Sequence, residues 1–170
     1  MKIRNVQREA QKEAEKQRVY LVLDNIRSVH NVGSIFRTAD CLGVSKIFLV
    51  GVTPTPKDRF DRVRKDFAKV SLGAENLVAW EHVSDLSKLL SKFKKQNVSV
   101  VAVEQASNSK DYRKIEISYP VAFIFGNEVE GVSEKILKRS DIIAEIPMKG
   151  SKESLNVSVA VGIALAQFLD

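Results

Sequence analysis

The sequence predicts an α/β domain with a mostly parallel β-sheet that carries helices on both faces. Three short runs, "VYLVLD" (19–24), "KIFLVG" (46–51) and "VAFIFG" (121–126), are almost entirely apolar. Such runs are typical of strands that are buried on both sides, as they are in parallel sheets. Helical segments separate them, and the chain has no internal repeat or low-complexity tract. We therefore expect a single α/β domain.

The other predicted elements continue this alternation. A helix is expected from Asn31, and another from Ser84 to Gln96 with Ser84 as its N-cap. Residues 2–17 read as a polar helix with a thin apolar stripe, so residues 1–18 are expected to be a helical extension ahead of a domain over 19–170. The remaining predictions are strands at 76–83, 98–104 and 141–147, and helices at 133–139 and 156–169.

Composition limits the class of protein. Of the 170 residues, 44% are hydrophobic and 28% are charged, as in soluble globular domains. No apolar run approaches the ~20 residues of a membrane span, and the polar N-terminus lacks the apolar centre of a signal peptide. We therefore expect a cytoplasmic protein without membrane contact. One cysteine and two histidines exclude an internal disulfide and argue against a zinc site, so no metal is expected.

The chain is basic, with a net charge of +6 and a pI of about 9.4. A basic balance favours a polyanionic partner, above all nucleic acid. Positive charge is dense in the extension, where a solvated helix face accounts for it, and at 57–69. The stretch at 57–69 follows a strand, and here we expect contacts with phosphate. Its candidate RNA-binding residues are Arg59, Arg62, Arg64 and Lys65.

The segment "HNVGSIFRTAD" (30–40) follows the first predicted strand. Asn31 is the predicted N-cap of the helix, because its side-chain oxygen can accept a free backbone N–H. Gly33 and Arg37 are four residues apart and share a helix face. Because Gly33 has no side chain, the pair is expected to form a shallow seat for an anionic or hydroxyl-bearing group. A capped helix with a surface arginine is the alternative.

In "FIFGNEVEGVS" (123–133), Gly126 and Gly131 bracket an acidic loop between a strand and a helix. Ligands of open α/β sheets lie beyond the carboxyl ends of strands, and glycine is expected where the backbone approaches a ligand. The loop lacks both the G-x-G-x-x-G of a dinucleotide fingerprint and the lysine of a P-loop. A plain strand-to-helix turn is the alternative.

The segment "IPMKGSKESLNVSVAVGIALAQF" (146–168) joins the last predicted strand to a helix that is apolar almost all round. Such a helix should be buried, either inside the domain or in a dimer interface. Its start is polar, with Ser154, Asn156 and Ser158. Buried polar groups need partners, so these side chains should either cap the helix or meet a ligand.

In this order and at these strand ends, the three segments resemble the SPOUT superfamily of RNA methyltransferases and, within it, the TrmH (SpoU) family of 2′-O-ribose methyltransferases. The residues that carry the resemblance are Asn31, Gly33 and Arg37, then "FGNEVEGVS", then "IPMKGSKESLNVSVA"; it extends over residues 19–170. The resemblance implies S-adenosyl-L-methionine as the cofactor, tRNA or rRNA as the substrate, and a homodimer. It also implies a deep C-terminal trefoil knot around the cofactor, which no pattern argument could predict because knots are nearly absent from other folds.

The resemblance also assigns roles to single positions. Arg37 would face the ribose and phosphate of the target nucleotide, Asn31 would hold the loop, and Glu128 is the nearest carboxylate by motif. A guanidinium stays protonated in proteins, so Arg37 is expected to orient the hydroxyl or hold phosphate rather than to take a proton. The implied catalytic residues are Arg37, Asn31 and Glu128, and the implied cofactor-binding residues are Gly126, Asn127, Gly131, Ile146, Met148, Leu155, Asn156 and Ser158.

Two other functions stay open at this stage. One is a non-catalytic RNA-binding or assembly factor on the same fold. The presence of all three complete segments argues against it. The other is a nucleotide-dependent enzyme on an ordinary doubly wound fold, against which the missing G-x-G-x-x-G speaks. The sequence does not choose between tRNA and rRNA.

Overall fold

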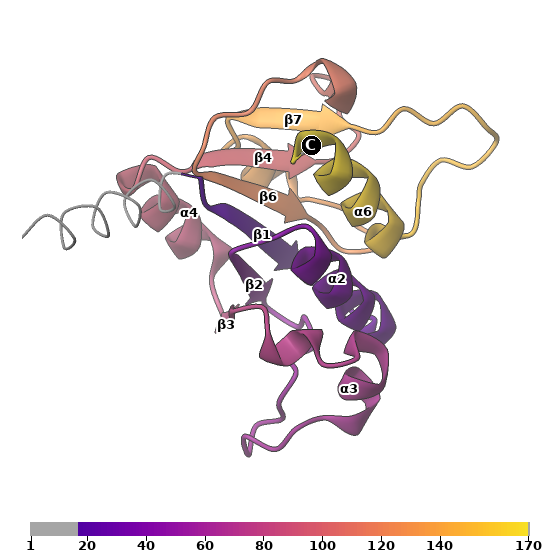
Figure 1. Cartoon of the computed structure of the whole chain (residues 1–170). Helices are drawn as coiled ribbons and strands as arrows, with labels where there is room; N and C mark the ends of the chain where they lie inside the picture. The colour runs from indigo at the N-terminus through magenta and orange to yellow at the C-terminus, as the bar shows by residue number, and fades with distance from the viewer. Residues whose placement is uncertain (1–16, 170) are drawn as a thin grey trace, which may run out of the picture.

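The computed structural model describes residues 17–169, which form a seven-stranded, all-parallel sheet with helices packed against it (Figure 1). The strand order is β3-β2-β1-β6-β4-β7-β5. The strands are β1 (Val19–Asp24), β2 (Lys46–Val50), β3 (Trp80–Val83), β4 (Ser99–Val103), β5 (Lys110–Asp111), β6 (Val121–Phe125) and β7 (Ile142–Glu145). The helices are α2 (Val29–Cys41), α3 (Lys65–Ser71), α4 (Leu86–Lys95), α5 (Glu134–Leu137) and α6 (Val157–Phe168), with short 3-10 turns at Ala74–Asn76 and Tyr112–Lys114.

Two hydrophobic cores lie on opposite faces of the sheet, because successive strand side chains point to opposite sides. In β1, Leu21 and Leu23 join the core beneath α2, α3 and α6, whereas Val22 joins the core beneath α4 and α5. The predicted α/β class, with a parallel sheet and helices on both faces, is confirmed.

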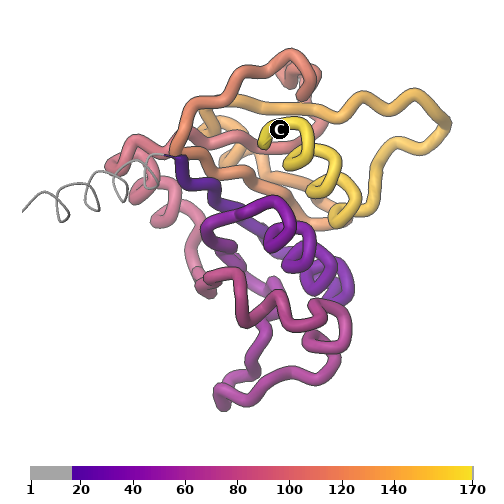
Figure 2. Tube along the Cα trace, in the orientation of Figure 1, coloured from indigo at the N-terminus to yellow at the C-terminus, as the bar shows by residue number. Residues whose placement is uncertain are grey.

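The strand order brings distant parts of the sequence to one edge of the sheet. β6 lies between β1 and β4, and β7 lies on the other side of β4. Since all strands are parallel, the segments after β1, β4, β6 and β7 emerge at the same carboxyl edge. Figure 2 shows the chain between β7 and α6 extending away from the sheet and returning to start α6, which lies beside α2.

Three predictions about the elements need correction or fall outside the described residues. The predicted strand 76–83 is shorter, because residues 74–76 form a 3-10 turn and the strand starts at Trp80. The N-cap of α4 is Asp85 rather than Ser84: its carboxylate accepts the backbone N–H groups of Ser87 and Lys88. The expected helical extension, residues 1–18, lies almost wholly outside the described residues. Between residues 17 and 169, no helix has the length and apolar character to cross a membrane.

Candidate functional site

A pocket of about 380 Å³ lies at the carboxyl edge of the sheet. Its floor is formed by the ends of β4 and β6, and its walls by the loop after β6, the segment after β7 and the first turns of α6. This volume lies within the range of pockets that bind small molecules. Six of the eight predicted cofactor-binding residues line it: Gly126, Asn127, Gly131, Ile146, Met148 and Leu155.

The loop after β6 is a tight turn that its two glycines make possible. Asn127 and Gly131 form an antiparallel bridge, and the Asn127 side chain accepts the backbone N–H groups of Val129 (2.8 Å) and Glu130 (3.1 Å). A Cβ atom on Gly126 would collide with the backbone of Gly131, and Gly131 has a φ of +67°. The two glycines are therefore required for the backbone to make this tight turn. The turn forms one wall of the pocket.

Glu104, which follows β4 directly, is a site residue that the sequence analysis missed. Its carboxylate accepts the backbone N–H of Val132 (2.8 Å) and that of Gln105 (2.8 Å), so it fixes the far end of the glycine turn. Gln105 donates from its side chain to the Glu153 carbonyl (2.9 Å) and so anchors the segment after β7. A carboxylate at the end of a predicted parallel strand was the available signal, but the sequence does not say that β4 lies beside β6.

The charge in the pocket has one sign. No lysine, arginine or histidine of residues 17–169 lines it, whereas four glutamates do: Glu104, Glu128, Glu130 and Glu153. Apolar side chains supply much of the remaining wall, namely Val103, Phe125, Ile146, Leu155, Val157 and Ala160. Electrostatics in such a pocket favours a ligand that has an apolar part and net positive charge, and disfavours phosphate groups.

A chain of hydrogen bonds joins the three sequence segments. The Asn31 amide donates to Glu128 Oε1 (3.1 Å), and Asn156 donates to Asn31 Oδ1 (3.1 Å). Glu128 also accepts the backbone N–H groups of Arg27 (3.1 Å) and Ser28 (3.3 Å). Burial raises the pKa of Glu128, but these hydrogen bonds outweigh it and leave the pKa below its ordinary value. Glu128 is therefore ionised at neutral pH and occupied in holding the start of α2.

Asn31 does not cap its helix, and this prediction is wrong. α2 begins two residues earlier, at Val29, and its N-cap is Ser28, whose side chain accepts the Asn31 N–H (3.2 Å). Asn31 thus lies in the first turn, where its side chain is free to link Glu128 to Asn156. The cap that the polar start of α6 predicts is present: Asn156 accepts the backbone N–H (2.9 Å) and the hydroxyl (2.6 Å) of Ser158. Neither Asn156 nor Ser158 lines the pocket.

The expected ligand seat at Gly33 is also wrong. Gly33 is buried, and a Cβ atom there would lie 2.9 Å from Val70 Cβ of α3. The missing side chain therefore lets α2 and α3 pack closely, a role that spacing within one helix cannot reveal because the partner helix is more than 30 residues away.

Arg37 is exposed on α2 and does not line the pocket. It follows Asn31 by six residues, which places it about 9 Å further along the helix axis. Among residues 17–169 it forms no ion pair or hydrogen bond through its side chain. The predicted catalytic residues thus fall into two groups. Glu128 lines the pocket and Asn31 is hydrogen-bonded to it, whereas Arg37 lies outside the pocket lining with no side-chain partner among residues 17–169.

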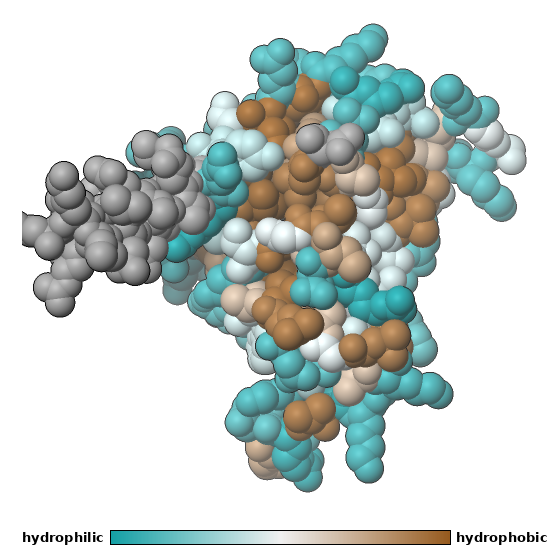
Figure 3. Space-filling model, in the orientation of Figure 1, coloured by the Kyte–Doolittle hydropathy of each residue, from teal (hydrophilic) through white to brown (hydrophobic). Residues whose placement is uncertain are grey.

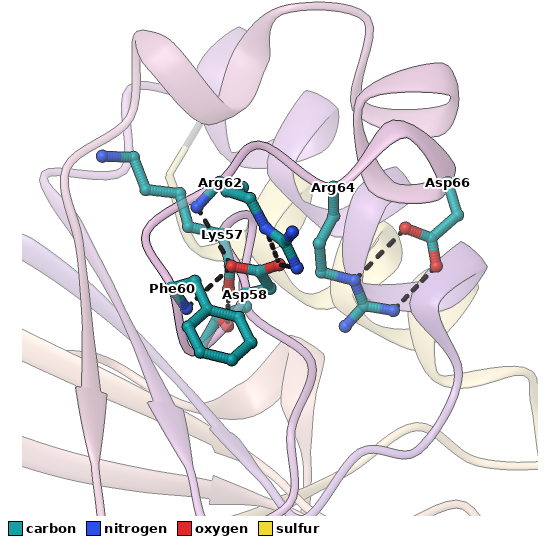
Figure 4. A network of polar contacts seen from close by, with 7 residues as sticks. Lys57, Asp58, Phe60, Arg62, Arg64 and Asp66 are labelled. Atoms are coloured by element: carbon teal, nitrogen blue, oxygen red, sulfur yellow. Dashed lines mark hydrogen bonds and ion pairs between the residues drawn. The ribbon is translucent and has the colours of Figure 1, made fainter.

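The predicted RNA-binding stretch forms a closed loop whose charges largely pair with one another (Figure 4). Arg62 pairs with Asp58 (2.7 Å) and Arg64 with Asp66 (2.7 Å). Asp58 also accepts the backbone N–H of Phe60 (2.8 Å), which holds the turn. Arg59 has no carboxylate partner in the part of the chain described, and its guanidinium lies 4.8 Å from the centroid of the exposed Phe60 ring. Lys65 is exposed at the start of α3.

Comparison with known proteins agrees with this geometry. Residues 18–166 match the model of the SpoU rRNA Methylase family. The chain belongs to the SpoU family. This match covers all of the segments that form the pocket and leaves out only the first seventeen residues and the last four.

Individual SpoU relatives extend the comparison. TrmH-family proteins of Staphylococcus aureus (strain MSSA476) and Bacillus subtilis (strain 168) are 36% and 33% identical over 155 and 156 residues, which is 91% and 92% of this chain. The chain spans about three-fifths of the length of these relatives (60% of each).

Solved structures of the family have the same fold. The A. aeolicus TrmH/SpoU tRNA modifying enzyme is 28% identical with a TM-score of 0.76, and the match covers 94% of this chain and 79% of that one. The AdoMet-bound rRNA methyltransferase from Sinorhizobium meliloti is 30% identical with a TM-score of 0.79, over 89% and 56% of the two chains.

Proposed function

We propose that the chain is an S-adenosylmethionine-dependent RNA 2′-O-ribose methyltransferase that acts on tRNA or rRNA. The observation that carries the proposal is the acidic, apolar-walled pocket that the segments after β4, β6 and β7 form in a SpoU-family chain. Relatives in this family include a structure with AdoMet bound, which supports the choice of cofactor.

The residues of the pocket fit S-adenosylmethionine. Its sulfonium and ammonium groups outnumber its single carboxylate, so it carries net positive charge, and the four glutamates complement that charge. Its adenine ring needs apolar walls such as Ile146, Leu155 and Val157 provide. A dinucleotide or nucleoside phosphate would bring negative charge into the same pocket, which weighs against the nucleotide-dependent alternative.

When bound, the cofactor supplies an electrophilic methyl group, and the chain's own residues hold and orient the reactants. We assign Gly126, Asn127, Gly131, Ile146, Met148 and Leu155 to direct contact with the cofactor, because they line the pocket. Asn156 and Ser158 would act indirectly by capping α6, and Asn156 would also position Asn31.

Arg37 is assigned to the target nucleotide. A guanidinium is permanently charged and presents a planar set of donors, which suits a phosphate together with a ribose hydroxyl. Its free donors on exposed α2 are consistent with this role. Because its pKa is lowered and its oxygens already accept hydrogen bonds, Glu128 is a weak base, so we assign it and Asn31 to positioning.

We also propose that the protein is a cytoplasmic homodimer with the trefoil knot that the family resemblance implies. Figure 3 shows hydrophobic side chains gathered over the face that carries α2 and α6, and Val159 of α6 is 48% exposed. Contiguous apolar surface is unusual on a monomer. An interface built on these helices would bring Arg37 of α2 close to the partner subunit.

One experiment separates this proposal from the alternatives. Ribose methylation is mapped across total tRNA and rRNA with and without the gene, and S-adenosylhomocysteine binding is measured by calorimetry on the purified protein. A methylated ribose that disappears with the gene, together with binding of the ligand, supports the methyltransferase. RNA binding without either result would indicate the non-catalytic assembly factor.

A further inference from the structure

A second charged surface lies on the opposite face of the sheet from α2 and α6, and no part of the proposed site uses it. A hollow of about 420 Å³ runs along the outer side of α4 and reaches Arg139, which lies just after α5. Of residues 17–169, those that line it are all basic or serine: Ser87, Lys88, Ser91, Lys92, Lys95 and Arg139.

The sequence of α4 explains why the lysines gather on one side. Leu86, Leu89, Leu90 and Phe93 are buried against the sheet. The lysines at 88, 92 and 95 follow the spacing i, i+4, i+7, which places them on one stripe of the helix. α4 contains four lysines and no acidic residue, so like charges face one another along this stripe.

Within the described part of the chain, these cations are not neutralised by ion pairs. No ion pair of Lys88, Lys92, Lys95 or Arg139 is found within residues 17–169. Glu81 and Asp85 lie near the stripe, and each already has another partner. Glu81 pairs with Lys46 (2.6 Å), with Lys92 adding a weaker attraction, and Asp85 accepts the backbone N–H groups at the start of the helix.

Arg139 is held in place at this surface. One of its terminal nitrogens donates to the Ser91 hydroxyl (3.0 Å), which itself donates to the Ser87 carbonyl (2.9 Å). A guanidinium has five N–H donors, so this contact fixes the group against α4 and leaves most of its donors for a ligand. Restricting the guanidinium in advance lowers the entropy lost on binding.

We propose that the outer face of α4, with Arg139, binds the phosphodiester backbone of the RNA substrate away from the methylation pocket. This inference rests on the proposed function, since it takes RNA to be the substrate. Four cations that form no ion pair within residues 17–169 complement the regular negative charge of a nucleic-acid strand. A membrane surface does not fit, because the apolar side of α4 is buried in the domain and is not available to lipid.

The position of α4 relates this surface to the pocket. α4 follows β3 and precedes β4 in an all-parallel sheet, so it starts at the carboxyl edge, where the pocket lies, and runs back to the other edge. Lys88 is therefore nearer the carboxyl edge than Lys95, which lies about 10 Å further along the helix. An RNA strand that passes the pocket edge can continue along this stripe.

The test compares two double variants with equal loss of charge. Lys88→Gln/Lys92→Gln removes two cations of the stripe, and Lys110→Gln/Lys114→Gln removes two exposed lysines from the far end of the sheet. Binding of total bacterial tRNA and of total rRNA is measured between 50 and 250 mM salt, conditions chosen because each lost phosphate contact lowers the salt slope by about 0.7–0.9. Two lost contacts lower the slope by about 1.4–1.8. If the variant and the wild type bind equally at 1 M salt, this slope predicts about 14- to 30-fold weaker binding at 0.15 M salt.

The expected result is this loss for the α4 variant alone, with recovery in Lys88→Arg/Lys92→Arg and unchanged S-adenosylhomocysteine affinity in all three variants. Equal loss in both double variants would show a general effect of net charge and would overturn the inference, as would unchanged binding in both. Wild-type protein that binds RNA through α4 but transfers no methyl group would refute the proposed function and leave this inference standing. If the wild-type protein binds neither total tRNA nor total rRNA, the inference is overturned.

Discussion

The pocket and the outer face of α4 carry opposite charge within one small basic protein. Within the described residues, the pocket is lined by four glutamates and no basic side chain. The hollow on α4 is lined, among the same residues, by three lysines, one arginine and no acidic residue. A net charge of +6 says nothing of this division. Separating the charges would allow one chain to bind the cationic cofactor and the proposed anionic RNA substrate without competition for the same groups.

The loop at 57–66 is a third case and shows why counting cations misleads. It contains five basic residues, as dense a cluster as any in the described chain, but three of them form ion pairs with Asp58, Asp61 and Asp66. The density of basic residues in the sequence favours this loop for contact with phosphate over α4. The structure shows that the loop uses much of its charge in internal ion pairs, while the lysines of α4 form none within residues 17–169.

The largest effect is expected from closing the pocket itself. Gly126→Ala places a Cβ atom against the backbone of Gly131, which cannot move without breaking the turn. We expect a loss of about 3 kcal/mol or more in the free energy of unfolding, at the upper end of overpacking effects, and loss of S-adenosylhomocysteine binding. Urea denaturation and calorimetry measure the two. Gly150→Ala, where a Cβ atom meets nothing within 4 Å, is the control and should change stability by less than about 0.5 kcal/mol. Normal binding in Gly126→Ala would show that the turn is not a wall of the cofactor site.

Arg37 should matter for the reaction and not for the pocket. Arg37→Ala removes a charged group that we assign to the target nucleotide, and loss of such a group commonly lowers the rate by about 100- to 1,000-fold. Single-turnover methyl transfer at saturating RNA and cofactor is the measurement. Arg37→Lys should be nearly as slow, because a lysine cannot replace a planar set of donors. Cofactor affinity should not change, since Arg37 does not line the pocket. Normal transfer in Arg37→Ala would make this residue structural.

The acidic character of the pocket should appear as a preference between two ligands. Glu130 lines the pocket, and Glu130→Gln removes one negative charge without changing the shape of the side chain. Affinity for cationic S-adenosylmethionine should fall about fivefold, the effect of one partly screened charge, while affinity for the product, which has lost the sulfonium charge, should change less. Glu134→Gln, at a glutamate that pairs with Lys138 outside the pocket, is the matched control. An equal change for both ligands would contradict electrostatic selection.

The smallest effect separates two arginines of the 57–66 loop. Arg59 has no carboxylate partner in the described chain, whereas Arg62 pairs with Asp58. Arg59→Gln should lower the salt slope of RNA binding by about 0.7–0.9, the value of one phosphate contact. Arg62→Gln should lower it by less, because its charge is already compensated. Equal effects would mean that RNA displaces the internal ion pairs and that the loop behaves like α4.

Several parts of the site could be predicted from the sequence because they depend on local chemistry. Residue type and short spacing predict both the two glycines of the turn after β6 and the polar start of α6. In the structure the glycines lie in a wall of the pocket, and the polar start caps α6. Asn31 and Gly33 show where local reasoning failed. The N-cap of α2 is Ser28 and not Asn31, and Val70 of α3 occupies the space beside Gly33 where a ligand was expected. In both cases another residue decided the outcome, and the pattern of one helix does not show either contact.

By itself, the sequence determined the class of fold, six of the seven strands and two of the three segments that line the pocket, because buried strands, glycine turns and capping residues each have a local physical signature. Only the tertiary structure decided which strands are neighbours. That order brings Glu104 beneath the glycine turn and joins Asn31 to both Glu128 and Asn156, contacts that span about 28 to 125 positions in the chain. It also decided which charges pair with one another, and hence which surface is left to bind a partner. Charge pairing depends on distances between side chains in space, and no one-dimensional pattern contains those distances.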